Sequence, residues 1–410
     1  MVETALEARD DVLKALPVPT PAFDASVWRI LGSPLLSGAD DGPLAGETVA
    51  VKDLFEVAGF AVGAGVPEYL RHAVPATTTA PAVRAMLDAG ASVHGIARTD
   101  EFAYSLAGTN EHYGTPPNPR VPGGLPGGSS SGPAAAVALG HASIGLGTDT
   151  AGSTRVPASY QGLWGLRSTH DAVSREGLLA LAPSFDAVGW LTRTPELLGL
   201  VAEASLAGDA QVSAPTDYAV AVSLVFAAEE GVQAAFVDSL DRLESAGLIP
   251  EPHIVDVGDL VELSAAFRTV QAAEAWREHG AWVGDHAGAL GGDVARRFDW
   301  ARQVSESEEA DARGRLSEAH DRLNIVLDGR ILLLPSTPSG APDRGATGRV
   351  VDATRIDTVS LTCLAAIGGY PAVSAPLLSV AGRPVGLGLV GPRLSDVSLV
   401  ATAARLVGID

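Results

Sequence analysis

The chain has 410 residues, of which 46% are hydrophobic and 19% charged, and its formal net charge is −21. This apolar content is enough for a large core, and the negative charge argues against binding to nucleic acid or to an anionic membrane. The single cysteine, Cys363, excludes an internal disulfide. Together with the lack of a signal-peptide pattern near the N-terminus, it predicts a cytoplasmic protein.

The first hundred residues predict alternating helices and strands. Residues 1–45 are expected to form a helix over 2–16 and then a Pro-rich loop that packs on the core. Alternation of this kind is typical of a layered α/β fold. After residue 45 the apolar patterns predict a strand over 46–55, a helix over 78–90, a strand over 92–96 and a short helix over 99–104.

The later chain continues the pattern and contains one long uncharged run. Residues 361–382 are numerous enough to span a bilayer, but their glycines and prolines interrupt the run and favour a buried core. We expect a single domain with α/β/α layers. The remaining expected helices are 132–140, 195–206, 229–247, 260–282, 294–324, 356–368 and 395–406, and the strands are 220–226, 331–334, 372–375 and 385–390.

A Gly- and Ser-rich stretch from residue 123 to 157 is the most unusual part of the chain. It reads GGLPGGSSSGPAAAVALGHASIGLGTDTAGSTRVP, and residues 121–148 contain no charged side chain. Glycine lets the backbone approach a ligand closely, and so apolar a stretch is a poor solvated loop. We therefore expect two buried turns, joined by a helix, that present serine hydroxyl groups and backbone N–H groups to one cavity.

Lys52 is a candidate base. Only two of the 28 basic residues are lysines, Lys14 and Lys52, and Lys52 follows the apolar run TVAV. Burial can lower the pKa of a lysine until it is neutral, whereas arginine stays charged in proteins. The alternative, a lysine whose stem packs on apolar surface while its ammonium reaches water, remains open at this point.

Other chemistries have weaker signals. The nine histidines form no metal-binding pattern, and Gly145-Leu146-Gly147 lacks the remainder of a phosphate-binding motif. The segment 128–132 formally matches the G-x-S-x-G nucleophile elbow, but a Pro/Gly loop precedes it instead of a strand. The segment 147–153 is better suited, because its small residues allow several N–H groups to converge on one oxygen beside Ser153. A serine nucleophile needs a base, which Lys52 can supply through the first serine cluster.

Four segments together resemble the amidase signature family of serine amidohydrolases. They are TVAVKDLF, PGGSSSGPAAAVA, GLGTDTAGSTRVPAS and GRPVGLGLVGPRLSD, and the resemblance covers residues 46–408. Within that family, DEFAYSLAGTNEHYGTPPNP, SFDAVGW and WREHGAW look like the short indole-3-acetamide hydrolase-type amidases. The resemblance implies an amidase signature domain over residues 46–410, with a central mixed, twisted sheet covered by helices.

The resemblance also implies a Ser–cis-Ser–Lys triad, without cofactor or metal. Ser153 would be the nucleophile, Ser129 the bridging serine on a cis peptide after Gly128, and neutral Lys52 the base. Ser130 would support them through a hydrogen bond, and Asp149 and Arg155 would be structural. The oxyanion hole would consist of the N–H groups of Thr150, Ala151, Gly152 and Ser153, with Ala151 in place of the usual glycine.

The expected substrate is a small aryl or arylalkyl carboxamide, cleaved to a carboxylic acid and ammonia or an amine through an acyl-enzyme. The alternatives are an anilide, carbamate or ester hydrolase with the same triad, the A-type subunit of a glutamine amidotransferase with partner proteins, and a catalytically silent scaffold. We expect a homodimer that binds neither nucleic acid nor membrane. The aromatic residues near the motifs predict the pocket, although each also suits an ordinary core position: Phe102, Tyr104, Tyr113, Tyr160, Trp164, Phe185 and Trp190.

Overall fold

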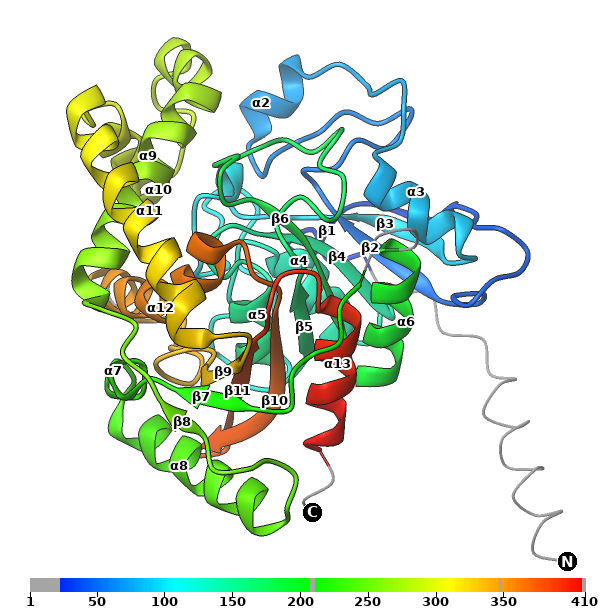
Figure 1. The fold of residues 1–410 in the computed structure, drawn as a ribbon. Coiled ribbons are helices and arrows are strands. Elements are labelled where there is room, and N and C mark those ends of the chain that lie inside the picture. The colour runs from blue at the N-terminus through cyan, green and yellow to red at the C-terminus, as the bar shows by residue number, and fades with distance from the viewer. Residues whose placement is uncertain (1–22, 207–210, 347, 408–410) are drawn as a thin grey trace, which may run out of the picture.

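The computed structural model describes residues 23–206, 211–346 and 348–407, and Figure 1 shows their fold. Eleven strands form one sheet in the order β1-β3-β2-β4-β6-β5-β10-β11-β9-β7-β8. The strands are β1 (Trp28–Leu36), β2 (Thr48–Lys52), β3 (Ser92–Ala97), β4 (Ile144–Asp149), β5 (Trp164–Arg167), β6 (Ala187–Thr192), β7 (Tyr218–Val220), β8 (His253–Ile254), β9 (Ile331–Pro335), β10 (Ala372–Val380) and β11 (Arg383–Val390).

The sheet is mixed, as expected. Strand β2 runs parallel to both of its neighbours, β3 and β4, whereas β4 to β9 pair antiparallel through β6, β5, β10 and β11. Strands β7, β8 and β9 are again parallel. Since β2 and β4 run side by side in one direction, their carboxyl ends bring Lys52 and Asp149 to the same edge of the sheet.

Helices cover both faces of the sheet. The described helices are α2 (Pro67–His72), α3 (Pro81–Asp88), the 3-10 turn η1 (Glu101–Ala103), α4 (Ser131–Ala138), α5 (Arg155–Gln161), α6 (Pro195–Ser205), α7 (Val222–Phe226), α8 (Glu230–Ser245), α9 (Leu260–Asp285), α10 (Gly292–Ala301), α11 (Glu306–Leu327), α12 (Gly348–Gly368) and α13 (Asp396–Arg405).

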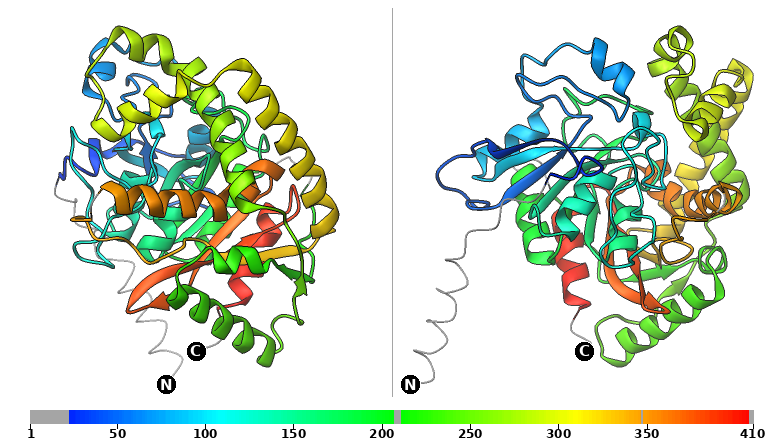
Figure 2. Two further views of the ribbon diagram at one scale, coloured as in Figure 1. Left: turned by 90° about the vertical axis from the view of Figure 1, so that its left-hand side faces the viewer. Right: turned by 180° about the vertical axis from the view of Figure 1, so that it is seen from behind.

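Two large apolar clusters separate the halves of the molecule. Helices α3, α6, α8 and α13 pack on one face of the sheet, whereas α4 and α5 pack on the other. Beyond α5, helices α9, α10 and α11 form a bundle at one side, and α12 lies against it (Figure 2). Among the described residues, no helix is both long enough and apolar enough to cross a membrane.

The N-terminal segment differs from the expectation. Residues 28–36, expected as a loop, form edge strand β1, which pairs antiparallel with β3. Pro34 is tolerated there because an edge strand has a free side that needs no N–H donor. The helix expected over 2–16 lies outside the described residues.

Two further element predictions need correction. The strand expected over 220–226 is wrong, because β7 ends at Val220 and Val222–Phe226 forms α7, which leaves Phe226 70% exposed. The helix expected over 294–324 divides into α10 and α11. Ser305 ends the first run by capping α11: its Oγ accepts from the N–H of Glu308, whose carboxylate accepts from the N–H of Ser305.

The uncharged run 361–382 is buried core, as expected. It forms the end of α12 and most of β10, joined by a turn at Gly369. Cys363 lies in this part of α12 and is fully buried, and burial raises the pKa of its thiol to about 12.

Candidate active site

Lys52 lies at the carboxyl end of β2 and is completely buried. Three hydroxyl oxygens surround its Nζ at hydrogen-bond distance: Thr148 Oγ1 at 2.7 Å, Ser129 Oγ at 2.8 Å and Ser130 Oγ at 3.1 Å. The alternative in which the amine reaches water is therefore wrong. The structure also adds Thr148, which the sequence analysis missed.

Burial of Lys52 has a direct electrostatic consequence. Loss of hydration lowers the pKa of its amine from 10.5 to about 7, although the buried carboxylates of Asp100, Asp149 and Asp186 act in the opposite direction. The groups that contact Nζ directly are neutral hydroxyls, which do not hold the proton as a carboxylate would. Neutral lysine is therefore accessible near neutral pH.

Ser129 follows a cis peptide bond after Gly128, as the family resemblance implied. Its carbonyl oxygen accepts from Thr99 Oγ1 at 2.9 Å. The buried Asp100 carboxylate anchors the same loop, because it accepts from Ser131 Oγ at 2.9 Å and from the N–H of Gly108 at 3.0 Å. A Cβ at Gly128 would clash with that carboxylate, so this position needs glycine.

Ser130 links the first serine loop to β4 and to the second serine. Its Oγ donates to the carbonyl oxygen of Thr148 at 3.2 Å, and its N–H donates to the carbonyl oxygen of Ser153 at 3.1 Å. Ser153 itself is buried, and its Oγ makes no hydrogen bond to any residue that the structure describes. The structure thus brings Lys52, Ser129, Ser130 and Ser153 together.

Asp149 holds the loop that carries Ser153. Its carboxylate accepts from the backbone N–H groups of Gly152, Thr154 and Arg155 at 2.9, 3.2 and 3.3 Å. It also binds the Arg155 guanidinium at 2.8 and 3.0 Å and that of Arg167 at 3.3 Å. Burial alone would raise the pKa of Asp149, but Arg155, Arg167 and the N–H donors outweigh it and hold that pKa well below its ordinary range.

This arrangement changes the expected oxyanion hole. The N–H of Gly152 is already bonded to Asp149, so it is not available to a substrate oxygen in this structure. The N–H groups of Thr150, Ala151 and Ser153 donate to no described residue. Gly152 has φ +112°, whereas Ala151 is outside the positive-φ region, so alanine at 151 introduces no backbone strain.

The predicted aromatic pocket residues separate into groups. Phe102, Tyr104, Tyr160 and Phe185 lie in the apolar cluster that contains Ala151. Trp164 and Trp190 belong instead to the core cluster with Met86 on another part of the sheet, so the structure does not bring them to the candidate site. Tyr113 lies in a loop, where the Arg98 guanidinium is 3.4 Å from its ring centre.

Helices α9 and α10 supply aromatic neighbours that the sequence analysis did not identify. The rings of Phe102 and His279 are 4.5 Å apart, those of Phe185 and Phe267 4.5 Å, and those of Tyr104 and Phe298 5.2 Å. The positions of Phe267, His279 and Phe298 along predicted helices gave no signal for this pairing, because it depends on how the bundle packs. The aromatic wall therefore combines η1 and the loop before β6 with the bundle.

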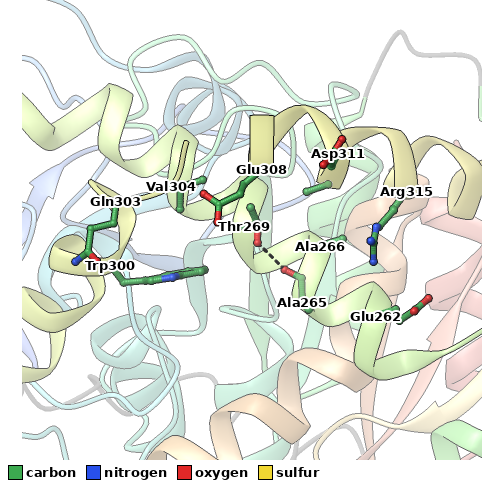
Figure 3. A pocket seen from close by; sticks show the side chains of 11 residues that line it. Glu262, Ala265, Ala266, Thr269, Trp300, Gln303, Val304, Glu308, Asp311 and Arg315 are labelled. Atoms are coloured by element: carbon green, nitrogen blue, oxygen red, sulfur yellow. Dashed lines mark hydrogen bonds between the residues drawn. The ribbon is translucent and has the colours of Figure 1, made fainter. Parts of the chain in front are cut away.

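The widest groove near the bundle is not the candidate site. It has a volume of about 440 Å³ and lies between α9, α10 and α11. Figure 3 shows its side chains, including Trp300, Glu308 and Arg315, and the Thr269 hydroxyl bonded to the backbone of Ala265. None of the hydroxyl or amine groups around Lys52 lines it.

One surface cluster offers metal-ligand atoms, although the sequence predicts no metal site. Glu68, His72 and His286 place one ligand atom each within 4.8 Å of one another, between α2 and the end of α9. Glu68 already pairs with Arg71 and His72. These side chains are at the surface, and they make no contact with the buried Lys52 group.

Comparison with known proteins agrees with this geometry. The family model described as Amidase matches residues 33–400. "Amidase 1" of Arabidopsis thaliana is 34% identical over 419 residues, which covers 94% of this chain and 99% of that protein. The A-type protein of glutamyl-tRNA(Gln) amidotransferase from Natronomonas pharaonis is 31% identical, and the match covers 90% of this chain and 96% of that protein.

A solved structure described as "Crystal structure of amidase" superposes with a TM-score of 0.82 at 27% identity and covers 98% of this chain and 94% of that one. The family model spans well over half of the chain, and its strands and helices have the arrangement seen in that structure. The chain therefore belongs to the amidase (amidase signature) family, whose members hydrolyse amide C–N bonds.

Proposed function

We propose that this amidase cleaves a small carboxamide with Ser153 as nucleophile, Ser129 as proton relay and Lys52 as base. The observation that carries this proposal is the fully buried Lys52 amine 2.8 Å from Ser129 Oγ, in a cage of neutral hydroxyls. A base must be deprotonated at the working pH, and the pKa of Lys52, about 7, meets that need.

The acylation step follows from this arrangement. Ser153 Oγ attacks the amide carbon while its proton passes to Ser129 Oγ, and the proton of Ser129 passes to neutral Lys52. The N–H groups of Thr150, Ala151 and Ser153 stabilise the negative charge on the carbonyl oxygen. When the C–N bond breaks, the Lys52 ammonium returns a proton through Ser129 to the leaving nitrogen.

Deacylation uses the same groups in reverse. Water attacks the ester on Ser153, and its proton passes through Ser129 to Lys52. The tetrahedral intermediate then collapses, Ser153 Oγ recovers a proton from Lys52 by way of Ser129, and the carboxylic acid leaves. Thr148 and Ser130 keep the Lys52 amine aimed at Ser129 throughout the cycle, since both contact Nζ from the side of β4.

The aromatic wall of Phe102, Tyr104 and Phe185 supports an aryl or arylalkyl acyl group. Anilides, carbamates and esters are alternatives, because the same groups can attack their carbonyl carbon. A second candidate is the glutaminase component of an amidotransferase, which the likeness to the Natronomonas pharaonis protein favours. We also propose a cytoplasmic homodimer, and sedimentation analysis of the purified chain tests the dimer.

The experiment is product formation by the purified chain alone, with Ser153→Ala as control. The substrates are indole-3-acetamide, benzamide, acetanilide, a phenyl carbamate and glutamine. Turnover that disappears in Ser153→Ala supports the triad, and labelling of Ser153 by a fluorophosphonate locates the nucleophile independently. Unchanged turnover in Ser153→Ala would refute the proposal, and glutamine turnover that requires partner proteins would favour the second candidate.

A further inference from the structure

A small cavity lies beside the candidate active site, between the loop after η1 and helices α5, α10 and α12. Its volume is about 20 Å³, and polar or charged side chains make up much of its wall. The members that matter here are Ser105, Tyr160, Arg297, Arg355 and Thr358. A site that encloses two guanidinium groups has little reason to be apolar space alone.

Three backbone connections place this cavity next to the reacting groups. The carbonyl oxygen of Leu106, which lines it, accepts from the N–H of Gly128 at 2.9 Å, directly before Ser129. Tyr160 is in α5, the helix that begins two residues after Ser153. On the third side, α12 contacts the oxyanion loop, since Thr362 Oγ1 donates to the carbonyl oxygen of Ala151 at 2.6 Å.

Helix α12 connects the cavity to the oxyanion loop along one face. Arg355, Thr358 and Thr362 are spaced three and four residues apart, so they share that face. Arg355 is seven residues before Thr362, which is about 10 Å along the helix axis. A small substrate whose carbonyl oxygen lies at the loop can therefore place its far end near Arg355.

The charges in the cavity are not balanced by carboxylates. Arg355 is partly buried, its Nε is enclosed without a hydrogen-bond partner, and it makes no ion pair with any described residue. Arg297 donates to the carbonyl oxygen of Tyr104 at 2.8 Å, and its nearest carboxylate, Asp352, is 3.7 Å away and half exposed. Burial lowers the pKa of Arg355 to about 10, and the charge of Arg297 lowers it further.

An arginine with a purely structural role looks different in this protein. Arg155, for example, binds Asp149 through two nitrogens and the carbonyl oxygen of Thr362 through a third. An enclosed guanidinium nitrogen that lacks an acceptor costs free energy, and in a chain with a net charge of −21 carboxylates were abundantly available to pair with it. The missing partner points to a ligand anion.

We propose that this cavity is an anion subsite in which Arg355, assisted by Arg297, binds a carboxylate of the substrate. The inference rests on the proposed function and names its substrate class: small amides that carry a free carboxylate at the end remote from the scissile bond. A guanidinium is suited to this role because its planar N–H groups bind both oxygens of a carboxylate. The hydroxyls of Tyr160, Ser105 and Thr358 supply further polar contacts around it.

The test compares two amides that differ in the remote group. Glutaramate has a carboxylate where valeramide has a methyl group, and both release ammonia. We expect glutaramate to have the higher kcat/KM, and Arg355→Met to lower the ratio of the two kcat/KM values by about 10–100-fold, the value of a charge-assisted hydrogen bond. Arg355→Lys should restore part of the ratio. Arg302→Met, at an exposed position near the end of α10, is the matched control and should leave the ratio unchanged.

A binding measurement makes the test independent of turnover. In the Ser153→Ala protein, calorimetry should detect glutarate, and the signal should disappear when Arg355→Met is added. Equal kcat/KM for glutaramate and valeramide, together with equal losses for both in Arg355→Met, would overturn the anion subsite while Ser153-dependent turnover upholds the proposed function. Turnover that does not depend on Ser153 would instead refute the triad.

Discussion

Lys52 and Asp149 are at the ends of two adjacent parallel strands, and both are completely buried, yet their surroundings differ. Lys52 contacts only neutral hydroxyl groups, so burial leaves its amine ready to titrate near pH 7. Asp149 contacts two guanidinium groups and three N–H donors, so its carboxylate stays ionised. Equal burial thus supports opposite roles: a proton acceptor on one strand and a permanent anchor on the other.

The largest expected effect tests the Lys52 side of this comparison. Lys52→Arg should lower kcat/KM for the best amide by about 10³–10⁴-fold, as should Lys52→Met, because a guanidinium cannot accept the proton. Steady-state kinetics with ammonia detection measures it, and thermal melting verifies that the variants fold. An Arg variant with near-normal activity would eliminate the neutral-lysine role.

Removal of Asp149 tests the anchor side and should appear in stability. Asp149→Asn leaves the buried guanidinium groups of Arg155 and Arg167 without their counter-charge, which typically costs about 3–5 kcal/mol. Denaturant unfolding measures the change in free energy. Asp293→Asn, at an exposed ion pair, is the control and should give no resolvable change. Equal stability of the two variants would contradict the anchor role.

The pH dependence should separate the two groups. Because neutral Lys52 is the active form, kcat/KM should rise with pH through an apparent pKa of about 7, whereas Asp149 adds no transition in that range. The folded pKa of Lys52 is below its unfolded value of 10.5, so the unfolded chain binds more protons between pH 7 and 10.5. The wild-type chain should therefore gain stability over Lys52→Met as pH rises through that window.

A flat kcat/KM profile from pH 6 to 8, or a stability difference that shrinks with rising pH, would contradict this assignment. Stopped assays in overlapping buffers of constant ionic strength provide the first measurement. Urea unfolding of the wild-type and Lys52→Met proteins at pH 7, 8 and 9 provides the second.

The smallest effects are expected in the loop that Asp149 holds. Ala151→Gly should change kcat/KM by less than about threefold, since Ala151 does not need positive φ. Gly152→Ala should be more harmful, because Gly152 has φ +112° and an added Cβ would lie 3.0 Å from Thr362 Cγ2. Kinetics of the two variants side by side checks the order, and a reversed order would mean that the loop conformation differs.

Much of the fold was predictable because burial is written into the sequence. The apolar runs of β2 and β9 and the uncharged end of α12 gave clear signals. The strand assigned over 220–226 failed because an apolar, β-branched run also suits a short surface helix, and only the packing of Leu224 decides between them. Edge strand β1 was missed because its Gly and Pro resemble a loop.

The candidate site was predictable in its reacting groups and not in their supports. Thr148 is 96 positions from Lys52, and no local pattern links them. The bond from Gly152 to Asp149 needs the three-dimensional turn. Trp190 shows the limit of closeness in sequence: side chains alternate along β6, so Trp190 packs in the core cluster with Met86 while Leu191 packs against α4 and α5.

The burial of Cys363 has a practical consequence for every variant described above. This cysteine is fully enclosed in α12, and its thiol pKa of about 12 leaves almost no thiolate near neutral pH. A thiol reagent can modify it only when this part of the helix opens to solvent. Because the sequence contains one cysteine, the modification rate reports the opening of the core beside the oxyanion loop from a single site, without any engineered label.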